Sequence, residues 1–370
     1  DALKETLYNR GMNTTLMVKL APTPEQHAAL LETMERFNAA CNYVADVAFQ
    51  EKSANKFALQ KLVYQTLRER FGLKAQMAVR VVGKVTEAYK RDKTKRVQFR
   101  KHGAMVYDQR ILSWKGLDRV SILSLSGRLL IPVIMGEYQA QRLRRVRGQA
   151  DLILRDGVFY LAVVVDAPEG TPIKNDDWLG VDLGIVNIAS DSDGDVYSGA
   201  ALNGIRHRHA RLRAKLQSKG TKSAKRLLKK RRRKESRFAR DVNHCISKKV
   251  VAKALDTSRG IALEDLTGIR ERTTVKKAQR RTHHSWAFYQ LRTFIQYKAQ
   301  LKGVSVLLVD PRNTSRTCFV CGCVDKRNRP SQDKFLCVSC GHADRADTNA
   351  ARNISRRAEV MRPNALTPTG

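Results

Sequence analysis

The chain has 370 residues, of which 42% are apolar, so it can form more than one hydrophobic core. Lys and Arg number 70 against 35 Asp and Glu, which leaves a formal net charge of +35. The composition excludes a disordered tail, and the charge predicts a polyanionic partner such as nucleic acid.

Two further classes are excluded. No segment reaches the roughly 18 apolar residues of a membrane helix, and the amino terminus lacks the pattern of a secretory signal, so we expect no membrane contact. The 7 cysteines are too few for a disulfide scaffold, and five of them fall between Cys318 and Cys340. This spacing indicates a metal cluster in the reducing cytoplasm.

The first part of the chain predicts a strand followed by helices. Residues 1–11 precede Met12 and are treated as upstream residues outside the fold. A strand is expected at 16–20. Thr23 then offers a helix cap, with Pro24 at the first helical position and Gln26 at the third. Apolar residues recur every three or four positions from there, so residues 23–92 are predicted to form a helical bundle.

The following segment changes to strand patterns. Short apolar runs bounded by Gly and charged residues predict strands at 120–125, 129–135, 152–154 and 158–165. Residues 12–22 and 93–172 are therefore expected to form one β-barrel into which the helical bundle is inserted. A run rich in Pro and Gly at 168–172 predicts a linker at its end.

The second half indicates an α/β domain. Buried strands are expected at 179–189, 260–264 and 304–309, with helical patterns between them. Strands that alternate with helices are typical of a sheet covered by helices.

Three acids occupy positions where a buried strand or an apolar helix does not need one: Asp182, Glu264 and Asp347. A buried carboxylate is costly unless it is paired or binds a metal ion. Three such groups together fit two divalent cations, roughly 3.5–4 Å apart, that flank a phosphodiester. Taken singly, Asp347 is also a natural helix cap, and Glu264 is also a natural partner for a nearby Arg.

Four cysteines have the spacing of a zinc site: Cys318, Cys321, Cys337 and Cys340. Two pairs of the form Cys-x2-Cys, separated by fifteen residues, supply the four thiolates that tetrahedral Zn²⁺ requires. The alternative is that four unrelated cysteines are buried without metal. Four cysteine ligands leave no open position, which predicts a structural zinc finger over 314–342, and the part played by Cys323 stays open.

The segments 180–185, 262–266 and 346–354 resemble the three RuvC motifs of the TnpB family. These proteins are RNA-guided nucleases of IS200/IS605-type transposons and relatives of the type V CRISPR effectors. The resemblance implies an RNase H-like (RuvC) nuclease domain over 173–313 and 343–360, interrupted by the zinc finger. It also implies a wedge-like barrel that carries a helical recognition bundle, and a flexible tail at 361–370.

The same resemblance assigns roles to particular residues. Asp182, Glu264 and Asp347 become the catalytic acids, which hold Mg²⁺ or Mn²⁺. The basic segment 206–234 has fifteen Lys or Arg and no acid, and in the family it is a helical hairpin near the guide RNA. Its alternative interpretation is a solvated helix face.

Candidate nucleic-acid contacts fall into two groups. The first group is basic, and comprises Arg91, Arg96, Arg226, Lys229, Lys230 and Arg231. The second could contact base edges beside the target, and comprises Asn42, Gln60, Gln76 and Arg80. Members of the second group are equally compatible with exposed polar positions on amphipathic helices.

We therefore expect a cytoplasmic prokaryotic enzyme that binds a guide RNA, recognises a short motif beside double-stranded target DNA, and cuts both strands at one site. A monomer is expected, with a dimer left open. Alternatives are a compact type V CRISPR effector, a nuclease-dead repressor guided by RNA, and a DNA-strand transferase that works without RNA. The guide sequence, the adjacent motif and the cut positions are left open.

Overall fold

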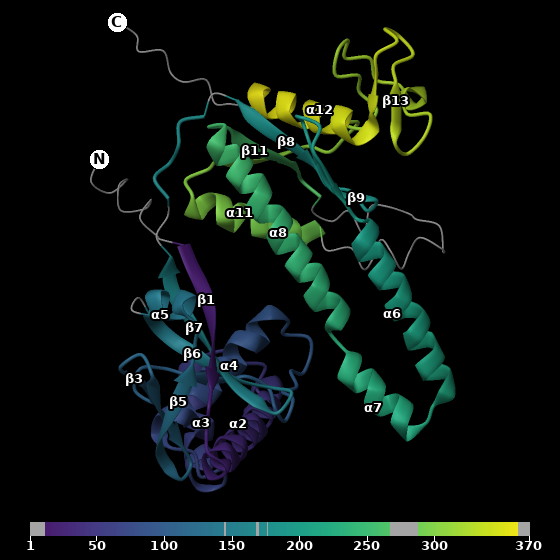
Figure 1. Cartoon of the computed structure of the whole chain (residues 1–370). Helices are drawn as coiled ribbons and strands as arrows, with labels where there is room; N and C mark the ends of the chain where they lie inside the picture. Colours follow the sequence, from purple (N-terminus) through teal and green to yellow (C-terminus); the bar gives the residue numbers. More distant parts are fainter. Residues whose placement is uncertain (1–11, 144–145, 168–169, 176, 267–287, 362–370) are drawn as a thin grey trace, which may run out of the picture. The chain divides into compact units, whose positions relative to one another are not determined.

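The computed structural model describes residues 12–143, 146–167, 170–175, 177–266 and 288–361. The chain forms two compact units that divide between Pro168 and Glu169 (Figure 1). The expectations for residues 1–11 and for the tail after 361 lie outside the described residues. None of the helices in the described ranges is long and apolar enough to cross a membrane.

Unit 1 contains a seven-stranded antiparallel sheet in the order β2-β6-β7-β1-β5-β4-β3. The strands are β1 (Met12–Leu20), β2 (Met105–Tyr107), β3 (Leu112–Lys115), β4 (Arg119–Ser124), β5 (Gly127–Ile134), β6 (Val146–Arg155) and β7 (Val158–Ala167). The order has two edge strands, β2 and β3, so the described strands do not close into a complete hydrogen-bonded barrel. The short helix α5 (Glu137–Leu143) and the strands β2 and β3 were not predicted from the sequence.

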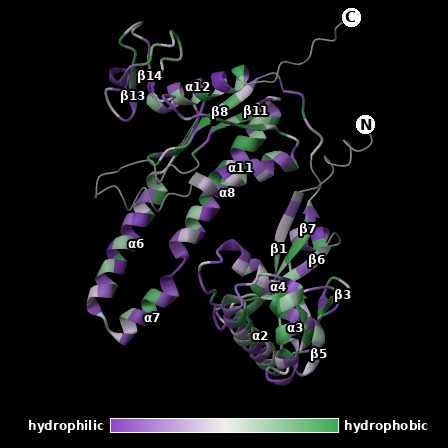
Figure 2. Ribbon diagram, turned by 180° about the vertical axis from the view of Figure 1, so that it is seen from behind, coloured by the Kyte–Doolittle hydropathy of each residue, from purple (hydrophilic) through white to green (hydrophobic). Residues whose placement is uncertain are grey.

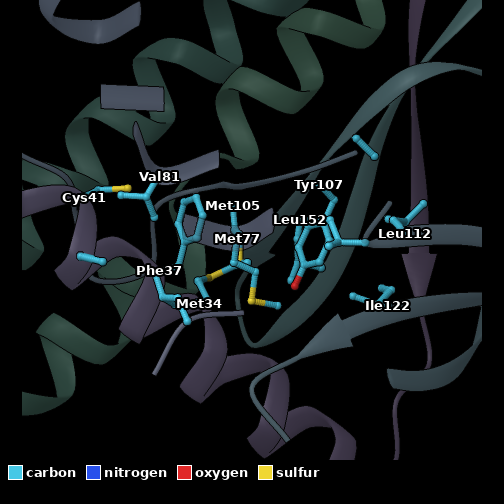
Figure 3. Packing of buried hydrophobic residues seen from close by; sticks show 14 of the residues in the cluster. Met34, Phe37, Cys41, Met77, Val81, Met105, Tyr107, Leu112, Ile122 and Leu152 are labelled. Atoms are coloured by element: carbon cyan, nitrogen blue, oxygen red, sulfur yellow. The ribbon is translucent and has the colours of Figure 1, made fainter. Parts of the chain in front are cut away.

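Three helices lie in the chain between β1 and β2: α2 (Pro24–Gln50), α3 (Lys56–Glu69) and α4 (Ala75–Arg91). The predicted start of α2 is confirmed, because the Thr23 side chain accepts from the Gln26 amide while the Gln26 side chain accepts from the Thr23 amide. Figure 3 shows that the apolar faces of α2 and α4 pack around Phe37 and Met77, next to Met105 of β2. Helices and sheet therefore share one core in unit 1.

Unit 2 contains a five-stranded mixed sheet in the order β10-β9-β8-β11-β12. Its strands are β8 (Trp178–Asp182), β9 (Asn187–Asp191), β10 (Val196–Ser198), β11 (Gly260–Glu264) and β12 (Val306–Val309). The strands β8, β11 and β12 run parallel, whereas β9 and β10 join by antiparallel pairing. The major helices are α6 (Ala200–Lys219), α7 (Lys222–Arg231), α8 (Lys234–Asp256), α11 (Phe288–Leu301) and α12 (Ala346–Val360).

Different helices pack on the two faces of this sheet. Successive side chains of a strand point to opposite faces, so neighbouring residues contact different helices. Leu179 and Val181 of β8 belong to the core that includes α8 and α11. Trp178 of β8 belongs instead to the cluster with Ile354 and Ala358 of α12. Asp182 lies four residues after Trp178, on the same face of β8, and Glu264 lies two residues after Ala262, which is in the same cluster. Both acids therefore point to the side that α12 covers.

Gly180 allows α12 to approach the sheet closely, and Figure 1 shows the helix lying along β8. A Cβ at Gly180 would lie 2.0 Å from the carbonyl oxygen of Ala351 and 2.7 Å from the amide nitrogen of Ser355. Only glycine fits such an approach of backbone to backbone. Gly180, two residues before Asp182, therefore sets the distance between β8 and α12.

The segment expected to be a linker is partly bound into unit 2. The Gly170 amide donates to Gln300 O and the Ile173 amide donates to Gly303 O. A Cβ at Gly303 would lie 1.8 Å from Thr171 O, so the two chain segments are in direct backbone contact. The expectation that residues up to 172 belong with the barrel is therefore wrong for 170–172, because their hydrogen bonds go to the turn after α11.

Candidate functional site

The three predicted acids line one cavity of about 330 Å³ in unit 2. Asp182 comes from the end of β8, Glu264 from the end of β11 and Asp347 from the first turn of α12. The parallel strands β8 and β11 end at the same edge of the sheet, which brings the first two together. Side chains that also line the cavity are Asn187, Thr314, Arg329, Gln332 and Asp333.

The electrostatics of the cavity favour a cation. Burial, and then the negative charges of Glu264 and Asp347, raise the pKa of the Asp182 carboxyl well above its usual value, and Arg329 opposes that shift. Burial also raises the pKa of Glu264, against the hydrogen bond from Thr314. These carboxylates are unfavourable as a group of bare charges, so a positively charged occupant stabilises them.

Hydrogen bonds orient two of the acids. Asn187 Nδ2 donates to Asp347 Oδ2 at 2.9 Å, and a guanidinium nitrogen of Arg329 lies 3.5 Å from Asp347 Oδ1. The hydroxyl of Thr314 donates to Glu264 Oε1. The side chains are thus held by Asn187 of β9 and by two residues of the predicted zinc-finger segment, 314–342.

Neither a helix cap at Asp347 nor an ion pair at Glu264 accounts for the positions of these acids. The cap residue of α12 is Arg345, and Asp347 sits inside the first turn, so the expectation of an Asp347 cap is wrong. The charge of Arg357 lowers the pKa of Glu264, but the hydrogen bond that reaches the Glu264 carboxylate comes from Thr314.

The four predicted cysteines lie close together: the Sγ atoms of Cys318, Cys321, Cys337 and Cys340 are all within 4.8 Å of one another. Two of the distances are 3.7 Å, from Cys318 to Cys340, and 3.5 Å, from Cys321 to Cys337. Tetrahedral Zn–S bonds of about 2.3 Å place sulfur atoms about 3.8 Å apart, so the cluster fits a metal ion. The three carboxylates surround a cavity and do not form such a tight group in the described structure.

The two cysteine pairs have the same local structure. The amide of Gly322 donates to Cys318 O, and the amide of Gly341 donates to Cys337 O, with both glycines at positive φ. Backbone amides of Cys340 and Ser339 donate to the Cys337 Sγ, and they lower the pKa of that thiol to about 6. A thiolate at neutral pH is a metal ligand.

Cys323 is half-buried and stands outside the group of four. Its carbonyl accepts from the Cys318 amide, as the carbonyl of His342 accepts from Cys337 in the second pair. Its backbone therefore completes the first knuckle.

Two asparagines of α12 connect the zinc-finger segment to the acid cavity. Asn349 accepts from the Phe319 amide and donates to Thr317 O. Asn353 donates to the carbonyls of Thr314 and Thr317. Thr314 in turn holds Glu264, so the fold of this segment is coupled to the position of a candidate metal ligand.

Arg329 was missed by the sequence analysis. It lies just after the short helix η1 (Lys326–Asn328) inside the zinc-finger segment, and its side chain also donates to Gln332 O at 2.7 Å. No local pattern marks an arginine that reaches an acid 18 residues later. Only the folded position identifies it as a cation at the carboxylate cavity.

If the chain cleaves DNA as its sequence predicts, replacing Arg329 by Ala should lower the cleavage rate about 10- to 100-fold, because the cation beside the acids is lost. Arg329→Lys should recover part of the rate. Initial cleavage rates measure both, and zinc content and thermal stability check that the fold persists. The control is Arg327→Ala, since Arg327 is exposed and paired with Asp325. Equal rates for Arg329→Ala and Arg327→Ala would remove Arg329 from the site.

Several candidate base contacts have partners within unit 1. Both Gln76 and Arg80 donate to Asp108 Oδ2, the latter from Nε at 2.7 Å. Asn42 donates to Phe99 O at 3.0 Å and accepts from the Phe99 amide at 2.7 Å. These three side chains thus bind helices α2 and α4 to the segment that follows α4. Their contact with DNA stays a prediction.

We expect Arg80→Ala to destabilise unit 1 by about 1–2 kcal/mol, because it leaves the largely buried Asp108 carboxylate without its charged partner. Urea unfolding of the full chain measures the loss. The matched control is Arg91→Ala, on an exposed position of the same helix. If Arg80→Ala kept full stability and lost only DNA binding, Arg80 would be a base contact and not a structural residue.

The remaining candidates are more accessible. Gln60 on α3 is half-buried, and Arg91 at the end of α4 is exposed. Arg96 forms an exposed ion pair with Asp46. On α7, Arg226, Lys229 and Lys230 are exposed and Arg231 is half-buried. Figure 2 shows that α6 and α7 are mainly hydrophilic, so α7 presents its positive charge to solvent.

Comparisons with known proteins assign the family. The Cas12f1-like TNB domain model matches residues 288–354, and the OrfB_IS605 model, described as a probable transposase, matches residues 162–268. A TnpB-like protein of Methanocaldococcus jannaschii is 33% identical over 256 residues, which cover 65% of this chain and 91% of that protein. The chain belongs to the TnpB family, and the resemblance inferred from the sequence is confirmed.

Type V relatives are also similar. The CRISPR-associated endodeoxyribonuclease Cas12f1 of Sulfoacidibacillus thermotolerans is 39% identical over 125 residues, or 34% of this chain. The chain spans only 28% of that relative's length. A solved Cas12f1 in complex with sgRNA and target DNA has a TM-score of 0.60 at 14% identity, covering 88% of this chain and 82% of that one. The chain therefore shares its fold.

Proposed function

We propose that the protein is an RNA-guided DNA endonuclease that cuts both strands of target DNA at one RuvC-like site. The observation that carries the proposal is the convergence of Asp182, Glu264 and Asp347 on one cavity. Its support is membership of the TnpB family and the similarity to Cas12f1, which is named an endodeoxyribonuclease. The arrangement of an acid on the first strand, an acid on the fourth and an acid on the last helix fits an RNase H-like nuclease.

Mg²⁺ or Mn²⁺ at the three acids would supply the Lewis acid and the activated water for phosphodiester hydrolysis. The chain's own residues orient the ligands: Thr314 fixes Glu264, and Asn187 fixes Asp347. Arg329 places a positive charge at the same cavity, where it can bind a phosphate oxygen. Zn²⁺ at the four cysteines would hold the segment that carries Arg329 and Thr314 in place.

Guide RNA is the proposed partner of the basic hairpin formed by α6, α7 and α8. Residues 206–234 of this hairpin hold fifteen Lys or Arg and no acid; these cations repel one another, and phosphates relieve that repulsion. Aromatic residues are only 6% of the chain, so stacking on many single-stranded bases is not the main mode of binding. A guide–target duplex held by its backbone fits better.

Exchanging Arg226, Lys229 and Lys230 together for Gln should reduce the slope of log affinity against log salt by about 2 to 3, since each phosphate contact contributes about 0.7–0.9. Fluorescence anisotropy with labelled guide RNA at several salt concentrations measures the slope. The control keeps the charge, with Arg226→Lys, Lys229→Arg and Lys230→Arg, and should keep the slope. An unchanged slope in the Gln variant would indicate that these α7 side chains are solvated and do not contact the RNA.

A compact type V effector is the second candidate function, favoured by the similarity to Cas12f1. The two differ in the source of the guide: a CRISPR transcript for the effector, and a transposon transcript for the TnpB-type enzyme. A nuclease-dead repressor is disfavoured because all three acids are present. We propose a monomer as the working form.

The deciding experiment sequences the RNA that co-purifies with the protein and then assays cleavage with it. We expect a discrete RNA that ends in transposon-flanking sequence, and Mg²⁺-dependent cutting of matched plasmid. RNase treatment should abolish the cutting. DNA joining that survives RNase would establish a strand transferase and overturn the proposal.

A further inference from the structure

A second pocket, of about 620 Å³, lies in unit 2 away from the acid cavity. It is bounded by the start of β8, the β9–β10 turn, the first cysteine knuckle and the exposed side of α12. Its lining includes Asp177, Trp178, Phe319, Arg352, Arg356 and Glu359. We propose that this pocket holds one unstacked base of a nucleic-acid strand. The inference rests on the proposed function only for the identity of that strand.

The charges of the pocket argue against a site for a simple anion. Its lining contains three arginines and three acids, so their formal charges cancel. Arg259 forms two hydrogen bonds with Asp193, at 2.9 and 2.6 Å, and Arg352 forms one with Asp344 at 2.8 Å. These two guanidinium groups are already neutralised, so a bare phosphate gains little from them.

Arg356 differs from the other two arginines. It is exposed, and its described hydrogen bond goes to the carbonyl of Phe319 at 2.8 Å. Its guanidinium carbon lies 5.6 Å from the centre of the Phe319 ring, and that of Arg352 lies 6.0 Å from it. Aromatic rings and arginine planes are the surfaces on which proteins stack unpaired bases.

The pocket also carries acceptors and donors that suit the edge of a base. Glu359 and Asp177 are exposed acids at the pocket, and a carboxylate accepts from the amino group of a base. Trp178 is 8% exposed, and its indole Nε1 has no hydrogen-bond partner among the residues that the structure describes. Donors, acceptors and a flat ring in one pocket match a nucleobase better than they match a phosphate.

The position of the pocket suits a strand that also reaches the acids. Trp178 begins β8 and Asp182 ends it, which is about 13 Å along the strand. Arg356 and Asp347 lie on the same helix, also about 13 Å apart. The two cavities therefore share β8 and α12 as walls, and the same nucleic acid can contact both.

The test uses Trp178 as a reporter in the full chain, with the other two tryptophans replaced (Trp114→Phe and Trp286→Phe). Single-stranded RNA of mixed sequence is titrated while Trp178 emission and the anisotropy of the labelled RNA are both recorded. We expect emission to change and to saturate together with the anisotropy. An abasic DNA strand of the same length should bind without changing the emission.

Phe319→Ala should abolish the emission change and weaken RNA binding about fivefold or more, whereas Phe319→Tyr should retain both. Arg345→Ala, exposed on the neighbouring β14 (Ala343–Arg345), is the charge control and should leave the emission change intact. RNA binding with unchanged Trp178 emission, or an equal response to abasic DNA, would overturn the base pocket while leaving the nuclease proposal standing. Absence of DNA cleavage with an intact emission response would overturn the nuclease proposal and leave the base pocket standing.

Discussion

Asp182→Ala is expected to reduce target DNA cleavage by about 10³-fold or more, while guided DNA binding stays within a few-fold of the unmodified protein. Burial raises the pKa of Asp182, and the negative charges of Glu264 and Asp347 raise it further, so Asp182 lies within reach of the charges of both other acids. Removing it takes away a central ligand for the cations on which hydrolysis depends. Binding relies on basic surfaces and base pairing elsewhere, so it should persist.

The matched control for this variant is Asp333→Asn. Asp333 lines the same cavity but is exposed and accepts a hydrogen bond from Ser331. We expect it to keep nearly full cleavage. Single-turnover cleavage and filter binding on the same preparations separate chemistry from binding. If Asp182→Ala cut at the rate of Asp333→Asn, Asp182 would not belong to the catalytic site.

Cys337→Ser is expected to remove bound zinc and, with it, most of the cleavage activity. Structural zinc sites contribute an apparent binding free energy of about 10–16 kcal/mol, so a three-cysteine site should fail to hold its fold. The segment between Cys318 and Cys340 carries Arg329, and its lead-in contains Thr314, which holds Glu264. Loss of zinc should therefore disorder the acid cavity from a distance.

Cys323→Ser provides the control, because Cys323 is close to the cluster but outside its four members. Zinc measured by mass spectrometry should be about one ion per chain in the unmodified protein and in Cys323→Ser, and close to zero in Cys337→Ser. A zinc content that fell equally in both variants would mean that Cys323 is a ligand.

Much of the acid site could be predicted because its signals are local. Asp182 and Glu264 each interrupt or end a buried apolar strand, and the alternation along those strands places both on one face. The cysteine spacing likewise predicted the group of four cysteines that lie together in the structure. These features depend on a few neighbouring residues, so periodicity and spacing are enough.

Other parts depend on contacts between distant segments. Arg329 reaches the acids only because the zinc-finger segment folds back on α12 through Asn349 and Asn353. Gln76 and Arg80 look like free polar positions on a helix until Asp108, which lies beyond the helical bundle, is placed beside them. Pairings of this kind leave no periodic pattern in the sequence.

The most direct test of the account locates divalent cations in the assembled complex of protein, guide RNA and target DNA. Crystals grown with Mn²⁺ give an anomalous signal at each bound ion. We predict peaks ligated by Asp182, Glu264 and Asp347, beside a target phosphodiester. Peaks elsewhere in a cleaving complex, with these three carboxylates ligating none of them, would contradict the account.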